Sequence, residues 1–429
     1  MSTTTPPADG TTTTGPSIEE FRADARAWLA ERLEPKPPPQ ELRWGVGSDS
    51  VAVFHNVSQD DMRALVDEGR RWMQEKATVG YHAVTWDTRY GGMGLSPLHE
   101  RAYREEESRF RGPLIHEAIA ITRDLIAPTI RAHGTDEQRD RFLARMLSTE
   151  EMWCQLYSEP GAGSDLAGLA TRAVRDGDEW VIDGQKVWTS GAQFADWGYI
   201  LCRTDPDVAK HRGITAFLVP MGADGVTVRP LRQMSGGASF NEVFFDGLRI
   251  PDTLRMDAEG AGWRVAMTTL GFERSAGSGE TGGLVPGKVT RLIQLARHLR
   301  RTDEPVVRQE LVGLWSHYRV QALTLQRARA RLRAGQTPGP EGSIGKLSND
   351  MGNVRMTRVA SLLLGARLTA DSGEWGTWAW SEHVTGTPGG QVAGGTDEIQ
   401  RNIVAERGLG LPGEPRTDRD VPWSEIPRN

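Results

Sequence analysis

The sequence predicts a mainly α-helical protein with a β domain in the middle of the chain. Three observations support this: helical periodicity dominates residues 17–150, short β-favouring runs fill residues 151–255, and helical periodicity returns in residues 256–412. Residues 1–16 are Thr, Pro and Gly with few apolar side chains and predict a disordered tail. Residues 413–429 are expected to form a C-terminal tail. A β domain between two helical domains creates clefts in which ligands commonly bind.

Start signals mark two helices of the N-terminal domain. Ser17 with Glu20 forms a capping box before an apolar face. Thr135 with Gln138 predicts a second helix start of the same kind.

The middle domain shows strand and turn signals. Residues 199–203, 215–219 and 242–245 are short β-favouring runs. Asp183-Gly184 and Asp246-Gly247 lie between such runs, and Asp-Gly is a strong signal for a hairpin turn.

One long helix is expected in the last domain. Its apolar residues recur at helical spacing and predict one buried face, namely Val307, Leu311, Leu314, Tyr318, Ala322 and Leu325.

Composition excludes several classes of function. The net charge of −6 disfavours nucleic acid as a partner. No apolar run approaches the roughly 18 residues of a membrane span, and no signal peptide is evident, so a cytoplasmic protein is expected. Two cysteines make no disulfide framework or thiolate metal site, and the nine histidines lack zinc-binding spacing, so no metal is expected.

Residues 155–165 (Gln-Leu-Tyr-Ser-Glu-Pro-Gly-Ala-Gly-Ser-Asp) are the most informative segment. Gly161 and Gly163 let a ligand approach the backbone closely, and Ser158 and Ser164 add hydroxyls. On these residues alone, a surface turn and a ligand loop are equally good interpretations. The segment is no Rossmann fingerprint, because a proline precedes the glycines and no strand-turn-helix frame surrounds them.

Residues 186–191 (Lys-Val-Trp-Thr-Ser-Gly) end a predicted strand with a large aromatic side chain. Trp188 is suited to stack on a flat ring, although a core tryptophan at a strand end is the commoner case.

Together these two segments resemble the acyl-CoA dehydrogenase family, in its middle-domain signature and in the strand beside the flavin ring. The resemblance extends over nearly the whole chain. It includes residues 90–94 (Tyr-Gly-Gly-Met-Gly), 260–263 (Gly-Ala-Gly-Trp) and 394–401 (Gly-Gly-Thr-Asp-Glu-Ile-Gln-Arg). It implies a helical N-terminal domain, a β-barrel-like middle domain and a C-terminal four-helix bundle.

The resemblance also implies bound FAD and α,β-dehydrogenation of an acyl-CoA, with electrons passed to an electron-transfer flavoprotein. The residues expected to contact FAD are Gln155, Tyr157, Ser158, Gly163, Ser164, Trp188, Thr189, Ser190, Thr396 and Glu398. Those expected along the thioester substrate are Ser164, Arg274 and Gly395.

The catalytic base is the main departure from the family pattern. Many members place a Glu directly before the Gly-Thr of the C-terminal run, where this chain has Gly394. Isovaleryl- and long-chain-type members instead carry the Glu on an early helix of the last domain, directly before an Arg, and Glu273 precedes Arg274 here. Glu273 is therefore the expected base, and the Gly394 backbone N–H keeps the oxyanion role. The alternatives are a non-catalytic subunit or a flavin oxidase of the same fold.

Two further family elements are missing, and both help to hold FAD across a subunit interface. Arg-x-x-Phe-Gly is replaced at residues 300–305, and Gln-x-x-Gly-Gly-x-Gly at residues 364–368. The expected assembly is a homo-oligomer (a dimer or a tetramer) or a mixed assembly with a related chain.

Overall fold

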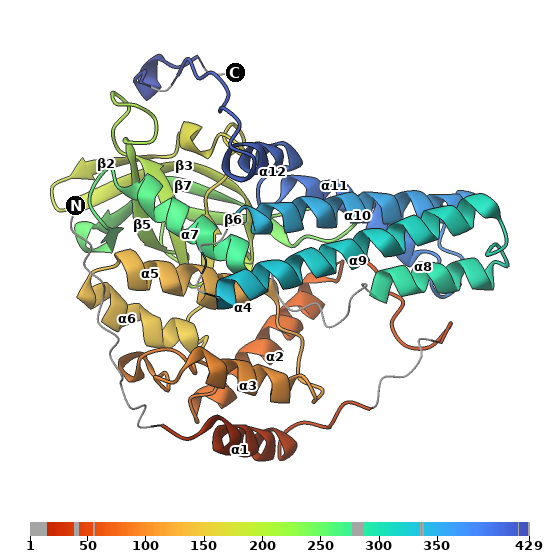
Figure 1. Cartoon of the computed structure of the whole chain (residues 1–429). Helices are drawn as coiled ribbons and strands as arrows, with labels where there is room; N and C mark the ends of the chain where they lie inside the picture. Colours follow the sequence, from red (N-terminus) through yellow and green to blue (C-terminus); the bar gives the residue numbers. More distant parts are fainter. Residues whose placement is uncertain are drawn as a thin grey trace, which may run out of the picture.

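The computed structural model describes residues 15–37, 43–54, 56–276, 287–334, 336, 339–418 and 420–427. They form a helical N-terminal part, a central β sheet and a C-terminal set of long helices, which confirms the predicted fold class (Figure 1). The predicted tail of residues 1–16 falls almost entirely outside the described residues. No helix in the described part of the chain has the length and apolar character needed to cross a membrane.

The N-terminal part contains six α-helices and a π-helix in the described residues. They are α1 (Ile18–Ala30), α2 (Gln59–Ala77), α3 (Pro97–Glu107), α4 (Glu117–Ala120), the π-helix Ile121–Ile126, α5 (Ala127–His133) and α6 (Asp136–Leu147). Both predicted capping boxes are confirmed, at Ser17 with Glu20 and at Thr135 with Gln138. They satisfy backbone N–H groups that the first turn of a helix leaves without partners.

The middle part is one eight-stranded sheet. Its strands are β1 (Trp153–Leu156), β2 (Arg172–Asp176), β3 (Glu179–Ser190), β4 (Trp197–Arg203), β5 (Ile214–Pro220), β6 (Val226–Leu231), β7 (Phe240–Pro251) and β8 (Arg255–Met256). Their order is β6-β7-β3-β2-β4-β5-β8, with β1 paired to β4. The three predicted strands lie within β4, β5 and β7. Within the described ranges the sheet ends at β6 and β8 without closing, so the expected barrel-like domain is an open sheet.

The two Asp-Gly pairs do not form hairpin turns, so this prediction is wrong. β3 and β7 run straight through them, and Asp246 and Gly247 of β7 together oppose Asp183 of β3. This is a β-bulge, in which Asp183 Oδ1 accepts the Gly247 N–H at 2.8 Å. Gly247 has φ +62°, and a Cβ at Gly184 would lie 2.7 Å from Thr171 Cα. A β-bulge, like a tight turn, needs glycine where the backbone is left-handed or closely packed, and the Asp-Gly pairs supply it.

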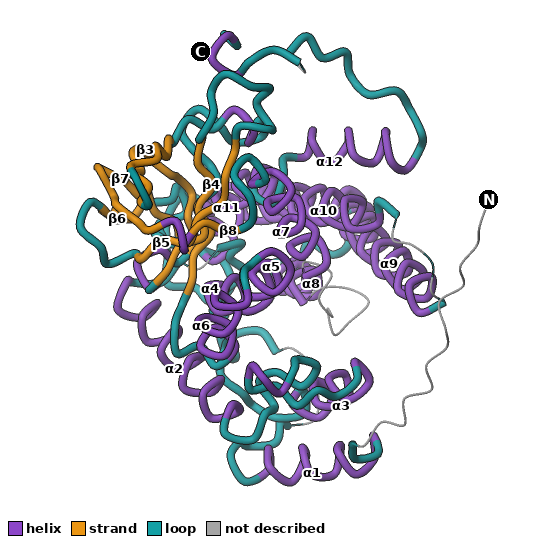
Figure 2. The backbone as a smooth tube through the Cα atoms, turned by 90° about the vertical axis from the view of Figure 1, so that its left-hand side faces the viewer, coloured by secondary structure: helices purple, strands orange, loops and turns teal. Residues whose placement is uncertain are grey.

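The C-terminal part consists of α7 (Gly262–Ala276), α8 (Gly287–His298), α9 (Pro305–Arg333), α10 (Glu341–Leu364), α11 (Ala379–Val392) and α12 (Asp397–Ile403). α10 packs against α8, α9 and α11. Four of the six residues predicted for the buried face of α9 are buried, from Val307 to Tyr318, and Ala322 and Leu325 are half-buried. Figure 2 shows the strands gathered in one region, with α5 and α7 beside them. α7 contacts β5, α5 and the π-helix, so it joins all three parts of the molecule.

Candidate active site

The two predicted ligand segments lie side by side. The Val187 N–H donates to the Ser158 carbonyl oxygen at 2.8 Å, which joins the end of β3 to the loop that follows β1. The pairing of β3 with β7 is irregular between Lys186 and Thr189, and Trp188 has φ +61°. Val187 and Thr189 on either side are buried, whereas Trp188 is 60% exposed. The bulge therefore turns a large aromatic side chain out of the core, where its face is available to a flat ligand ring.

Two polar atoms beside Trp188 are buried without protein partners. Thr189 Oγ1 and Asn241 Oδ1 have no hydrogen-bond partner among the described residues, although the Asn241 amide donates to the Thr189 carbonyl at 3.0 Å. Nearly all buried polar atoms in proteins are hydrogen-bonded, so such atoms at a predicted site indicate a ligand. Thr189 was predicted as a site residue. Asn241 was not, because it lies in β7, far along the sequence from both motifs.

A buried ion pair holds the 158–165 loop from beneath, and sequence reasoning missed it. Lys186 is fully buried, and its ammonium lies 2.7 Å from Glu159 Oε1 and 3.1 Å from the Tyr157 carbonyl oxygen. The Glu159 carboxylate also accepts the N–H groups of Ala170 and Thr171 at 2.6 and 2.9 Å. Burial alone raises the pKa of Glu159, but Lys186 and these hydrogen bonds together hold it below its ordinary value.

The tip of the 158–165 loop is exposed. Gly163 and Ser164 are exposed and Ser158 is half-buried. A Cβ at Gly161 or Gly163 would meet no protein atom within 4 Å, so protein packing does not require glycine at either position. Close approach by a ligand would require it.

The other predicted residues of the β domain have different environments. Gln155 is half-buried in β1 and Ser190 is half-buried at the end of β3. The Tyr157 side chain is in the core, where its hydroxyl donates to Tyr199 at 2.9 Å. Burial raises the pKa of Tyr157 well above its ordinary value, and the Glu273 charge adds to this effect.

Glu273 continues the buried face of α7. Val265 and Thr269 are buried and stand eight and four residues before Glu273, a spacing that puts all three side chains on one side of the helix. The Thr269 hydroxyl lies 3.0 Å from that of Thr129 on α5. Glu273 is half-buried rather than an exposed helix charge. The side chain of its neighbour Arg274 lies outside the described residues.

The Glu273 carboxylate lies close to Gly394. A Cβ built on Gly394 would lie 3.5 Å from Glu273 Oε1. Gly394 and Gly395 have φ +65° and +86° and form the loop between α11 and α12. The buried Gln400 amide donates to both of their carbonyl oxygens, at 2.9 and 3.3 Å. The Glu273 carboxylate therefore lies next to the space that a side chain at position 394 would enter.

The remaining residues of this loop serve α12. Thr396 Oγ1 caps the helix by accepting the Ile399 N–H at 3.3 Å. Glu398 is exposed and lies 3.4 Å from Arg401. Lys346 of α10 lies 2.7 Å from Asp350 and 3.4 Å from Asp397, which ties the start of α12 to the bundle.

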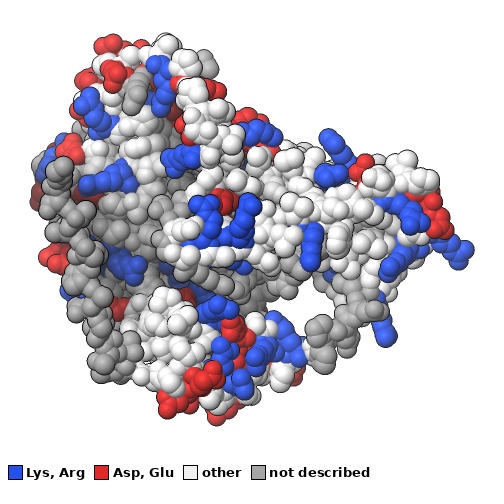
Figure 3. Space-filling model, in the orientation of Figure 1, with Lys and Arg blue, Asp and Glu red and all other residues white. Residues whose placement is uncertain are grey.

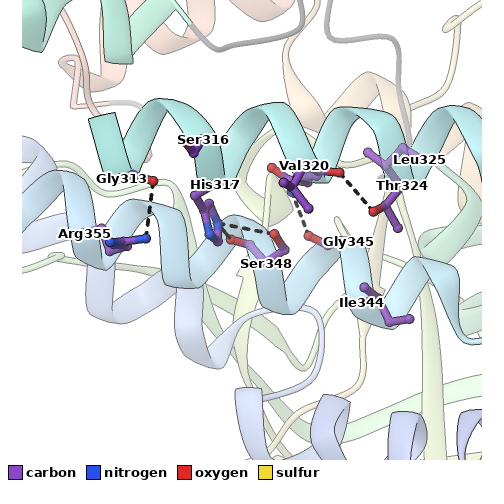
Figure 4. A pocket seen from close by; sticks show the side chains of 11 residues that line it. Gly313, Ser316, His317, Val320, Thr324, Leu325, Ile344, Gly345, Ser348 and Arg355 are labelled. Carbon is purple, nitrogen blue, oxygen red and sulfur yellow. Dashed lines mark hydrogen bonds between the residues drawn. The ribbon is translucent and has the colours of Figure 1, made fainter. Parts of the chain in front are cut away.

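A cavity of about 380 Å³ lies elsewhere, between α9 and α10 (Figure 4). His317 and Ser348 line it, and the His317 ring lies 2.7 Å from the Ser348 carbonyl oxygen. None of the predicted site residues lines this cavity. The described residues hold no group of three His, Cys, Asp or Glu side chains suited to a metal ion.

Three family models match the chain in order: acyl-CoA dehydrogenase N-terminal domain at residues 52–150, middle domain at 154–248 and C-terminal domain at 260–409. The chain therefore belongs to the acyl-CoA dehydrogenase family. Acyl-CoA dehydrogenase IpdE1 of Mycobacterium tuberculosis is 38% identical over 400 residues, which cover 92% of this chain and 98% of that protein.

Two solved structures extend the comparison. The Tcur3481-Tcur3483 steroid ACAD has a TM-score of 0.70 and 27% identity, and covers 92% of this chain and 98% of its own. The ChsE4-ChsE5 complex from Mycobacterium tuberculosis has a TM-score of 0.65 and 27% identity, and the match covers 94% of this chain and 100% of the chain in that complex.

FAD is the cofactor of this family, and this chain is a flavoprotein acyl-CoA dehydrogenase. The residues present fit the cofactor. An exposed indole can stack on a flat ring, and two buried polar atoms without partners among the described residues can bond to it. A glycine loop open to close approach suits a phosphate-bearing chain.

Proposed function

We propose that the chain desaturates an acyl-CoA thioester between its α and β carbons, with Glu273 as the catalytic base. The observation that carries this proposal is the 3.5 Å approach of Glu273 Oε1 to the Cβ position of Gly394. Ser158, Trp188 and Thr189 would hold FAD, which would supply the hydride acceptor for the β carbon. The product is the trans-2-enoyl-CoA.

The half-buried setting of Glu273 suits proton abstraction. A carboxylate partly removed from water is a stronger base than an exposed one, because desolvation disfavours its charged form. As the proton leaves, negative charge builds on the thioester oxygen, and a fixed N–H donor stabilises it. Gly394 supplies that N–H, and the absence of a long side chain at this position leaves room for the Glu273 carboxylate.

The roles of the remaining site residues are those that the family resemblance implies. Ser158, Gly163, Trp188, Thr189 and Ser190 hold the flavin side of the site, with Gln155 and Tyr157 on the strand and turn beneath them. Thr396 and Glu398 contact the adenylate side. Ser164, Arg274 and Gly395 lie along the thioester.

The substrate we propose is a bulky, branched or ring-bearing acyl-CoA. The resemblance to isovaleryl-type members, which carry the base on the same early helix, supports this class, and one of the similar structures is described as a steroid ACAD. The electron acceptor we propose is an electron-transfer flavoprotein.

We also propose that a second chain covers α9. Five large apolar residues are exposed along this helix in the described part of the chain: Val306, Val312, Trp315, Val320 and Leu323. Monomeric proteins rarely leave such a stripe uncovered. The missing interface motifs and the two-chain name of the ChsE4-ChsE5 neighbour favour a related chain over a second copy.

The test is anaerobic bleaching of the flavin absorbance by a panel of acyl-CoAs, with the chain alone. Ring-bearing or branched thioesters should bleach it fastest. A marked preference for butyryl-CoA would contradict the substrate class. Bleaching only after a related chain is added would support a half-site subunit, and rapid reoxidation by oxygen with peroxide release would indicate an oxidase.

A further inference from the structure

The end of the chain folds back onto the β domain. We call residues 411–418 and 420–427 the C-terminal strap; they lie beyond the matched C-terminal family domain, which ends at residue 409. The Trp423 N–H donates to the Val208 carbonyl at 2.9 Å, and the Ser424 N–H donates to the Pro206 carbonyl at 2.8 Å. The strap therefore packs along the connection between β4 and β5 (Figure 1).

Arg203 links the strap to the segment that follows the 158–165 loop. Its buried guanidinium donates to the carbonyl oxygens of Ala167 at 2.6 Å and Leu169 at 3.2 Å. The Trp423 ring lies over it, 4.6 Å from the guanidinium carbon, and the Trp423 indole N–H donates to the Gly168 carbonyl at 3.2 Å. Removal of Trp423 would expose this cluster of hydrogen bonds to water.

Lys210 makes a second link, directly to the 158–165 loop. Its ammonium is nearly buried and lies 2.9 Å from both carboxylate oxygens of Asp165 and 2.5 Å from Asp418 of the strap. Lys210 and Arg416 hold the pKa of Asp418 down to about 2, so Asp418 stays charged at neutral pH. One lysine thus joins the last residue of the loop to the strap.

We propose that the C-terminal strap is a positioning element of the active site, which holds residues 161–168 in the conformation that binds FAD. A tail that packed only for stability would need neither the shared lysine nor the bonds to residues 167–169. The Trp423–Gly168 hydrogen bond ends on this segment directly. The contacts Trp423–Arg203 and Asp418–Lys210 reach it through one further bond each, from Arg203 to Ala167 and from Lys210 to Asp165. The assignment of FAD as the ligand of the segment rests on the proposed function of the loop.

The experiment compares Trp423→Ala and Asp418→Asn with a matched control, Asp420→Asn, an exposed aspartate of the same strap. Amide hydrogen exchange of the FAD-free full chain measures the opening of residues 161–168. Fluorescence titration of the same proteins measures the FAD dissociation constant. Both variants should exchange faster than the control in this segment and bind FAD at least about tenfold more weakly, which corresponds to about 1.4 kcal/mol.

Exchange equal to that of the control would overturn the proposal, and so would faster exchange with unchanged FAD affinity. Asp418→Asn keeps the size of the side chain, so the test survives if Trp423→Ala fails to fold. If the wild-type chain binds no FAD, the proposed function fails, and the exchange measurement still decides whether the strap holds the segment.

Discussion

Replacement of Lys186 by methionine should destabilise the protein by about 3 kcal/mol. Lys186 is fully buried and pairs with Glu159 at 2.7 Å, so the substitution leaves a buried carboxylate without its cation. Loss of one partner of a buried pair costs roughly 3–5 kcal/mol. The lower end applies because the N–H groups of Ala170 and Thr171 still bond Glu159.

The assay is urea unfolding of the wild type, Lys186→Met and the double variant Lys186→Met/Glu159→Gln. The double variant should recover part of the loss, because it removes the unpaired charge. Lys288→Met is the matched control: its ammonium donates to the Ala52 carbonyl at 2.9 Å, and loss of one hydrogen bond costs about 1 kcal/mol. Equal decreases in the free energy of unfolding for Lys186→Met and Lys288→Met would refute the reasoning.

The same pair sets a pH dependence. The pKa of Glu159 is lowered in the folded protein, so its stabilising contribution is complete above the ordinary value of 4.5 and is lost as pH falls through the folded value. In Lys186→Met the lysine no longer opposes the effect of burial, so the pKa of Glu159 in the folded protein rises. Glu159 should therefore lose less stabilisation on acidification in the variant, and the stability difference between wild type and Lys186→Met should shrink as pH falls below 4.5, which unfolding midpoints across a pH series will measure.

Three further substitutions separate folding from cofactor binding. Gly394→Ala should lower the melting temperature, because φ +65° costs a non-glycine residue about 1–2 kcal/mol, while the 3.5 Å contact with Glu273 leaves room for the methyl group. Thr189→Val should change the free energy of unfolding of the FAD-free protein in urea by no more than about 0.5 kcal/mol, because the hydroxyl has no partner among the described residues. The same variant should bind FAD more weakly in a fluorescence titration. Trp188→Ala should behave similarly, since its side chain is 60% exposed; a large loss of stability without any loss of FAD affinity would contradict its stacking role.

Local sequence signals predicted the parts of the fold that local chemistry decides. The capping boxes at Ser17 and Thr135 were found because cap and partner are three residues apart. The Asp-Gly prediction failed because φ at Gly247 is a local property, whereas turn or bulge depends on how β3 pairs with β7. An Asp-Gly pair alone does not carry that information.

The candidate site likewise contains residues that local sequence signals predicted and residues that they did not. The segments around Ser158 and Trp188 were recognised because each is a contiguous motif. Glu273 was identified only through the resemblance, because the burial of its helix face depends on packing against α5 and the sheet. The ion pair of Glu159 with Lys186 and the contact of Trp423 with Arg203 join residues far apart in the chain, and only the tertiary structure brings them together.

The most direct test of the central claim is anaerobic stopped-flow reduction of the Glu273→Gln variant by a good acyl-CoA substrate. Glutamine keeps the size of the side chain and most of its hydrogen bonding but accepts no proton at neutral pH. If Glu273 is the base, the variant should bind FAD and acyl-CoA as the wild type does, and flavin reduction should slow by at least about a hundredfold, the low end for loss of a general base. Reduction at a rate near that of the wild type would show that another group takes the proton and would contradict the account.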